Sequence, residues 1–126
     1  MFEFRLDHIQ LAMPPGEADK ARAFFVGLLG FDEEPKPEPL ASRGGCWFRH
    51  GDVMVHLGVE AEFSPQKKAH PAFTVRPLEA LADRLKEHDY PVKWDRSIVG
   101  CPRFFSTDPF GNRMEFLARD SSPLGR

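Results

Sequence analysis

The feature that most restricts the fold of this chain is a loose internal repeat with an offset of 62 positions. His8 and Pro15 in the first half correspond to His70 and Pro77 in the second half. In each half, a strand-like run is followed by a helical run and then by three short strand-like runs. The residue identities repeat poorly, so the repeat is one of topology, and a single α+β domain without a duplication remains the alternative. The sequence therefore predicts an α+β fold made of two βαβββ modules.

Module one is expected to occupy about residues 1–60 of a single domain that spans residues 1–126. A strand-like run from Phe4 to Met13 ends at a Pro-Pro-Gly turn, and a helical run from Glu17 to Leu29 follows with apolar residues on one face. Gly30 is a natural C-terminal cap for that helix. Turn-forming residues separate three more expected strands, at Phe31–Glu34, Gly45–His50 and Val53–Glu60.

Module two is expected at about residues 70–120, after a linker at about 61–69 and before a tail at 121–126. His70–Val75 has strand character, and Pro77 begins a helix whose apolar face carries Leu78, Leu81, Ala82 and Leu85. Three further strands are expected at Val92–Arg96, Arg103–Thr107 and Asn112–Ala118. With 126 residues, the chain is long enough to form one full hydrophobic core and too short for two ordinary domains.

Strand alternation predicts which side chains share a face of each sheet. In four strands, one face is apolar and suited to packing against a helix on the outer side. If the sheets curve as half-barrels, the opposite faces line one shared cavity. The side chains expected on these faces are His8, Gln10, Met54, His56, His70, Arg103, Phe105 and Glu115.

Three of these residues form a candidate metal site. Two imidazoles and a carboxylate, from His8, His70 and Glu115, are typical ligands of a divalent metal that keeps open positions for substrate. Glu115 lies between Met114 and Phe116, where a carboxylate needs a cation or a hydrogen-bond network. Arg103 is a candidate for binding a substrate oxygen, with a structural ion pair to Asp108 or Glu60 as the alternative. Gln10, Met54 and Phe105 are candidate substrate-lining residues.

Composition excludes several classes of protein. The net charge is −2, so no basic excess indicates nucleic-acid binding. The apolar runs are shorter than the roughly 18 residues of a membrane span, and the first residues do not resemble a signal peptide. Cys46 and Cys101 fall in no metal-binding spacing. A cytoplasmic location is the expectation, with a disulfide between the two cysteines left open.

Three segments resemble the vicinal oxygen chelate superfamily, which includes glyoxalase I, bleomycin-resistance proteins and extradiol dioxygenases. They are Leu6–Met13, Ala21–Phe31 and Asp108–Phe116. The resemblance covers nearly the whole chain and implies paired βαβββ modules and a homodimer. It also implies that the metal ligands are His8, His70 and Glu115. Many members take a further ligand, a glutamate or glutamine, from the fourth strand, where this chain has Met54 and His56.

The resemblance implies a small metal-dependent enzyme of the lyase or isomerase type, acting on neighbouring oxygens of a small metabolite. Glu115 and His56 are then the candidate catalytic residues, although His56 remains equally a ligand or a substrate contact. Zinc, nickel, manganese, cobalt and iron all remain possible. Two alternatives stay open: an iron(II)-dependent extradiol-type dioxygenase, and a non-catalytic dimer that binds a small molecule as bleomycin-resistance proteins do.

Overall fold

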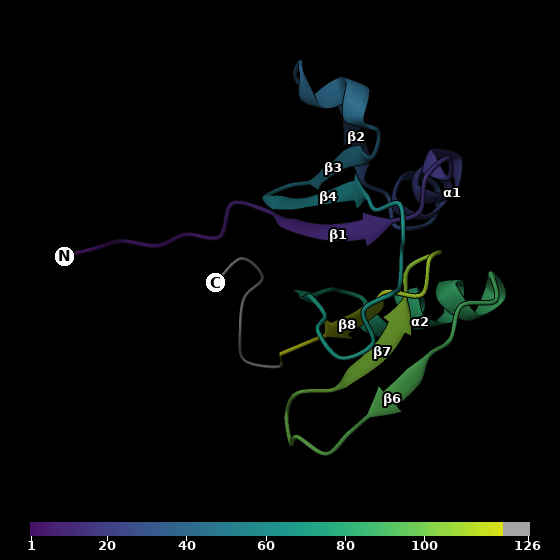
Figure 1. Ribbon diagram of the computed structural model, residues 1–126. Helices are drawn as coiled ribbons and strands as arrows, with labels where there is room; N and C mark the ends of the chain where they lie inside the picture. Colours follow the sequence, from purple (N-terminus) through teal and green to yellow (C-terminus); the bar gives the residue numbers. More distant parts are fainter. Residues whose placement is uncertain (120–126) are drawn as a thin grey trace. The chain divides into compact units, whose positions relative to one another are not determined.

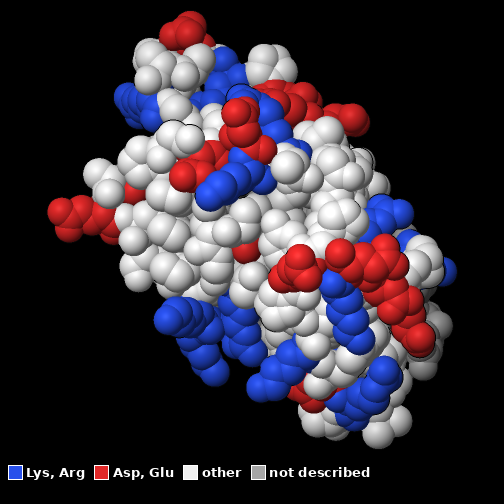
Figure 2. All heavy atoms as spheres, turned by 90° about the vertical axis from the view of Figure 1, so that its right-hand side faces the viewer, with Lys and Arg blue, Asp and Glu red and all other residues white. Residues whose placement is uncertain are grey.

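A computed structural model describes residues 1–119 of the chain (Figure 1). The chain divides into two compact units, Met1–Pro65 and a second one that begins at Gln66. The expected tail at 121–126 lies outside the described residues. On the face drawn in Figure 2, acidic and basic side chains are interspersed. Within residues 1–119, no helix combines the length and the apolar character that crossing a membrane requires.

The first unit contains a four-stranded mixed sheet (Figure 1). Its strands are β1 (Ile9–Met13), β2 (Asp32–Glu34), β3 (Cys46–His50) and β4 (Val53–Val59), in the order β1-β4-β3-β2. β1 runs parallel to β4, whereas the β2–β3 and β3–β4 pairs are antiparallel. Parallel neighbours need a long connection, and here the helix and two strands between β1 and β4 provide it.

The helical segment of the first unit begins as α1 (Ala18–Arg22) and continues as the π-helical turn η1 (Ala23–Leu28). Its buried residues are Ala21, Phe24, Phe25 and Leu28, the same apolar face that the sequence predicts. Gly30 ends the segment with a φ of +82°, a conformation that favours glycine, so the predicted C-terminal cap is confirmed. A short 3-10 helix, η2 (Leu40–Arg43), precedes β3 and was not predicted from the sequence.

The second unit repeats this topology. It contains β5 (Ala72–Thr74), α2 (Leu78–Glu87), β6 (Lys93–Asp95), β7 (Arg103–Thr107) and β8 (Arg113–Leu117), with sheet order β5-β8-β7-β6. β5 is parallel to β8, and the other pairs are antiparallel. α2 buries Leu78, Ala82 and Leu85. The predicted α+β fold of two βαβββ modules is confirmed, with each module forming an open sheet.

Each unit has its own apolar core, and each core contains packed aromatic rings. In the first unit, the Phe25 ring stacks on the Phe48 ring with centroids 5.1 Å apart. In the second unit, Phe104 lies between Phe116 at 5.3 Å and Trp94 at 5.1 Å. Phe48, opposite Val55, and Phe116 lie on the sheet faces that strand alternation predicts as apolar, so the opposite faces are left for polar side chains.

Two of the predicted strands are too long at their N-terminal ends. β1 begins at Ile9 instead of Phe4, and β5 begins at Ala72 instead of His70. The register explains the first difference: Ile9 pairs with Val55, and β4 itself begins at Val53, so residues before Asp7 have no neighbouring strand in β4. His8 and His70 therefore lie in the segments that lead into the strands.

Candidate functional site

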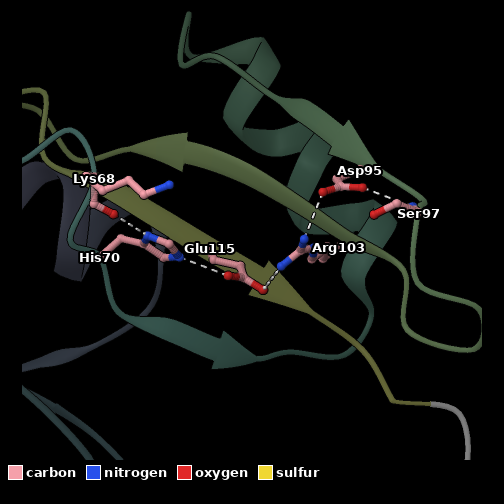
Figure 3. Close-up of polar contacts among 6 residues, drawn as sticks. All are labelled: Lys68, His70, Asp95, Ser97, Arg103 and Glu115. Carbon is pink, nitrogen blue, oxygen red and sulfur yellow. Dashed lines mark hydrogen bonds and ion pairs between the residues drawn. The ribbon is translucent and has the colours of Figure 1, made fainter.

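A polar contact in the second unit joins His70 and Glu115 (Figure 3). His70 lies two residues before β5, and Glu115 lies in the middle of β8, opposite Ala72. The Nε2 atom of His70 is 2.9 Å from Oε1 of Glu115. On the other side of the ring, Nδ1 is 2.8 Å from the backbone carbonyl oxygen of Lys68. Two of the three expected metal ligands are thus in direct contact within one unit.

These contacts constrain the protonation of the pair. A carbonyl oxygen only accepts, so Nδ1 of His70 carries the proton that it donates to Lys68. In a neutral imidazole, Nε2 is then a lone-pair acceptor that faces a second acceptor, the Glu115 carboxylate. Two acceptors at 2.9 Å need a shared cation, either a proton between them or a metal ion that both atoms bind. Neighbouring ligand atoms at about 2.1 Å from an octahedral metal lie about 3.0 Å apart, so the pair fits both.

Arg103 on β7 binds the other oxygen of the Glu115 carboxylate (Figure 3). One terminal nitrogen of the guanidinium is 3.3 Å from Oε2 of Glu115, and the other is 2.8 Å from Oδ2 of Asp95. The hydrogen bond to Glu115 is the main cause that raises the pKa of Arg103. The ion-pair partners are therefore Glu115 and Asp95, not the expected Asp108 or Glu60. Glu115 is 8% exposed, so both of its oxygens have directed partners in a largely buried setting.

Phe105, also on β7, lies beside this group. Its ring meets the His70 ring edge to face, with centroids 5.4 Å apart, and the Arg113 guanidinium lies 4.0 Å from its centroid. Arg103 lies 5.2 Å from the same ring. A phenyl face attracts cations, so Phe105 interacts favourably with both guanidinium groups. The expected grouping of His70, Arg103, Phe105 and Glu115 on one sheet face is what the structure contains.

Asp95 has a strongly lowered pKa, about 2. Hydrogen bonds from Ser97 are the largest cause, including one of 2.9 Å from its backbone N–H to Oδ1, and Arg103 adds to them. Because the pKa in the folded state lies below the ordinary 3.8, the charged form favours folding. That contribution is complete above about pH 4 and is lost as the pH falls through about 2.

We therefore expect Asp95→Asn to destabilise the protein at neutral pH and to lose this effect in acid. The difference in thermal midpoint between wild type and the variant should shrink as the pH is lowered from about 4 to about 2, because protonated Asp95 carries no charge. Melting curves at successive pH values measure it. Asp83→Asn, on the exposed side of α2, is the control, and a pH-independent difference for Asp95→Asn would contradict the expectation.

On the first unit, His8 and His56 form an aromatic stack with Trp47. The His8 and His56 rings are 4.1 Å apart, and the other face of His56 lies 4.0 Å from the Trp47 ring. Nδ1 of His8 is 2.8 Å from Oδ2 of Asp7, which leaves Nε2 of His8 for another contact. Burial, followed by the nearby His8, lowers the pKa of His56. Within the described residues, Nε2 of the buried His56 has no hydrogen-bond partner.

Gln10 and Met54 lie next to this stack in the same sheet. Gln10 is opposite His56 in the β1–β4 register, and its amide occupies the space that a Cβ on Gly58 would need, with Nε2 only 2.7 Å away. Gly58 is thus required for Gln10 to lie across β4. Met54 is half buried, two residues before His56 on β4. The first unit therefore brings together His8, His56 and Gln10, as strand alternation predicts.

Sequence reasoning did not predict three of the contacts in these groups. Trp47 stacks on His56, Asp95 binds Arg103, and the Lys68 carbonyl orients His70. The turn at Gly51-Asp52 was a usable signal for Trp47, because it pairs His50 with Val53 and hence Trp47 with His56. Within either unit of the described chain, no group of three or more His, Cys, Asp or Glu side chains is arranged to hold a metal ion.

Comparison with known proteins adds a family assignment. The profile of the Glyoxalase/Bleomycin resistance protein/Dioxygenase superfamily matches residues 5–116. A glyoxalase family protein from Bacillus anthracis is 42% identical, with 94% of this chain and 98% of that chain covered and a TM-score of 0.89. No curated protein sequence matches the chain.

More distant solved structures share the fold. The fosfomycin resistance protein FosX from Listeria monocytogenes is 16% identical, with 94% and 93% of the two chains covered and a TM-score of 0.76. A glutamate-to-glutamine mutant of that protein was solved with Mn(II) and 1S,2S-dihydroxypropylphosphonic acid. A glyoxalase/dioxygenase from Nostoc punctiforme is 19% identical, with 91% of each chain covered and a TM-score of 0.71.

Proposed function

This chain belongs to the Glyoxalase/Bleomycin resistance protein/Dioxygenase superfamily, and on this basis we propose that it is a metal-dependent enzyme of the lyase or isomerase type. It acts on a small metabolite that presents two neighbouring oxygens. One divalent metal ion is bound by His70 and Glu115, with His8 as a third ligand. The support for His8 is its sequence position and its free Nε2, because Nδ1 contacts Asp7.

The observation that carries the proposal is the contact of 2.9 Å between Nε2 of His70 and Oε1 of Glu115. Lys68 fixes the proton on the other ring nitrogen, so the two facing atoms are both available as ligands. Orientation of a ligand histidine by a backbone carbonyl is a recurring feature of metal sites. The manganese complex of the FosX mutant, which shares the fold, is consistent with a metal here.

A bound divalent metal would supply Lewis-acid polarisation of the two substrate oxygens. Arg103 keeps Oε2 of Glu115 in a fixed direction, so that Oε1 faces His70. Glu115 is also proposed as a proton-transfer residue, a role that a carboxylate with a fixed orientation supports. His56 is proposed as a second acid–base or substrate-contacting group, because its buried Nε2 is free to bond to a ligand.

The remaining proposed contacts are with substrate. Arg103 and Phe105 lie beside the Glu115 carboxylate, where a cation and an apolar ring would bind an anionic or planar part of a metabolite. Gln10 presents an amide next to the His56 stack, and Met54 adds an adaptable apolar side chain. These side chains favour a small polar organic substrate.

Metal content is the test of this function. Protein stripped by chelation and reloaded is expected to bind about one divalent ion per chain, measured by elemental analysis and titration calorimetry. His70→Gln and Glu115→Gln should each weaken the affinity by more than the roughly 10–100-fold typical of losing an outer hydrogen-bond partner. His88→Gln, at the exposed end of α2, is the matched control and should bind like wild type.

The identity of the metal then discriminates among reaction classes. Zinc, nickel, cobalt or manganese in the isolated protein supports the lyase or isomerase, whereas iron supports the dioxygenase. Binding of acetohydroxamate, a probe with two adjacent oxygens, to the metal-loaded form is expected, and none to the stripped form. Failure of the wild type to take up metal, or full uptake by Glu115→Gln, would refute the proposal. The non-catalytic dimer that binds a small molecule would then be the remaining alternative.

A further inference from the structure

Asp95, Arg103 and Glu115 form a line of charges across three adjacent strands of the second sheet (Figure 3). Asp95 on β6 lies directly opposite Arg103 on β7, and Glu115 on β8 lies opposite Phe105, two residues further along β7. The two terminal nitrogens of the guanidinium contact different carboxylates: one is 2.8 Å from Oδ2 of Asp95, and the other is 3.3 Å from Oε2 of Glu115. Arg103 is therefore shared between the edge strand β6 and the strand that carries a proposed metal ligand.

The Asp95 end of this line is anchored by the backbone. Oδ1 of Asp95 accepts a hydrogen bond of 2.9 Å from the backbone N–H of Ser97, while Oδ2 faces Arg103. The bond from Arg103 to Asp95 is also the shorter of the two that join its guanidinium to carboxylates. Because the guanidinium is planar and rigid, fixing one of its terminal nitrogens restricts where the other can lie. Asp95 thus helps to determine how Arg103 approaches Glu115.

A guanidinium that is not shared in this way would pair more closely with a single carboxylate. Arginine often forms two parallel N–H···O bonds to both oxygens of one carboxylate. Nε of Arg103 has no hydrogen-bond partner within residues 1–119, and loss of the bond to Asp95 would leave a second donor unused. A two-bond pair with Glu115 would include Oε1, the atom that faces Nε2 of His70. Arg103 would then compete with a metal ion for Oε1.

We propose that Asp95 is a positioning residue of the metal site: it holds Arg103 on Oε2 of Glu115 and thereby keeps Oε1 available to the metal ion. This inference rests on the proposed function, and it adds a residue that is neither a ligand nor a substrate contact. Charge acts in the same direction. Two carboxylates and one guanidinium leave one negative charge in excess, which attracts a divalent cation, and neutralising Asp95 removes that excess.

Asp95→Asn tests the proposal, because it keeps the size of the side chain and weakens its bond to Arg103. Its affinity for Zn²⁺ and Mn²⁺ is measured at neutral pH by titration calorimetry, on protein stripped by chelation. We expect a loss of about tenfold, at the lower end of the 10–100-fold typical of an outer hydrogen-bond partner.

Glu34→Gln is the matched control. Glu34 lies 3.1 Å from Arg49, in a carboxylate–arginine pair between β2 and β3 of the first unit. The side chains of Glu34 and Asp95 are 32% and 31% exposed, so the two variants make the same chemical change in similar surroundings. The Glu34–Arg49 pair is not linked to Glu115, and Glu34→Gln should bind both ions like wild type.

Combination with Arg103→Met separates positioning from a general loss of structure. If Asp95 acts through Arg103, Asp95→Asn should lower the affinity when Arg103 is present and have no further effect in the Arg103→Met background. Arg103→Gln provides a second background, and circular dichroism checks that each variant is folded.

The outcomes distinguish this inference from the proposed function. If the wild type binds neither ion, the proposed function is refuted and this inference with it. If the wild type binds metal and Asp95→Asn binds it equally well, only the positioning role is overturned. The same holds if Asp95→Asn causes an equal loss in the Arg103→Met background, or if Glu34→Gln loses as much affinity as Asp95→Asn.

Discussion

Replacing Phe25 with alanine is expected to lower the free energy of unfolding by about 3–5 kcal/mol. The Phe25 side chain is fully buried, and its ring contacts three others: it stacks on Phe48 and meets Phe24 and Phe31 edge to face. Alanine removes these contacts and leaves a cavity in the core between the helical segment and the sheet. Urea unfolding followed by circular dichroism measures the difference.

Val26→Ala in the same helical turn is the matched control. Val26 is 38% exposed, so its truncation removes little buried surface and should change stability by about 0.5 kcal/mol or less. A small loss for Phe25→Ala, comparable to that of Val26→Ala, would mean that this ring does not contribute to the core as the contacts indicate.

Removal of the Asp108 carboxylate is expected to cost about 2–4 kcal/mol of stability. Asp108 is 1% exposed, and its Oδ1 accepts hydrogen bonds of 2.9 Å from the backbone N–H groups of Phe110 and Asn112. Its Oδ2 accepts a third bond, of 2.8 Å, from the Asn112 side chain. Asp108→Ala would leave these buried donors without an acceptor. Thermal and urea unfolding check the loss.

Asp108→Asn keeps the shape of the side chain and removes its charge, so it tests the two contributions separately. Its amide oxygen can still accept the two backbone bonds, but its NH₂ group would face the NH₂ group of Asn112. Burial raises the pKa of Asp108, so loss of charge itself costs little. We expect a smaller destabilisation than for alanine, and equal stability of the alanine variant and wild type would contradict the structural role of this turn.

Alternation of apolar and polar residues was sufficient to predict both modules, because the pattern reports which side of a strand is buried. It did not predict where the strands begin. Phe4 and Leu6 belong to a strand pattern, yet β1 begins only at Ile9, because strand length within one chain depends on the neighbouring strand. The π-helical turn at Ala23–Leu28 was also not predictable, since apolar spacing does not reveal a shift in backbone hydrogen bonding.

The residues on the polar face of each sheet could be predicted to a similar extent. Residue type and parity placed His70, Arg103 and Glu115 on one face, and the structure brings them into contact. The role of Asp95 was not predictable, because it depends on the pairing of β6 with β7, which puts Asp95 opposite Arg103. The metal ligands, the substrate contacts and the dimer stay predictions.

The parallel pairs β1–β4 and β5–β8 have a consequence for the order in which each unit folds. Each joins the first strand of a unit to its last, so it closes the longest loop in that sheet and bears the largest loop-closure entropy. Such non-local pairs form late, after the local hairpins. His70 leads into β5 and Glu115 lies on β8. We therefore expect the contact between His70 and Glu115 to form only when β5 pairs with β8. A partly folded second unit would then lack this contact.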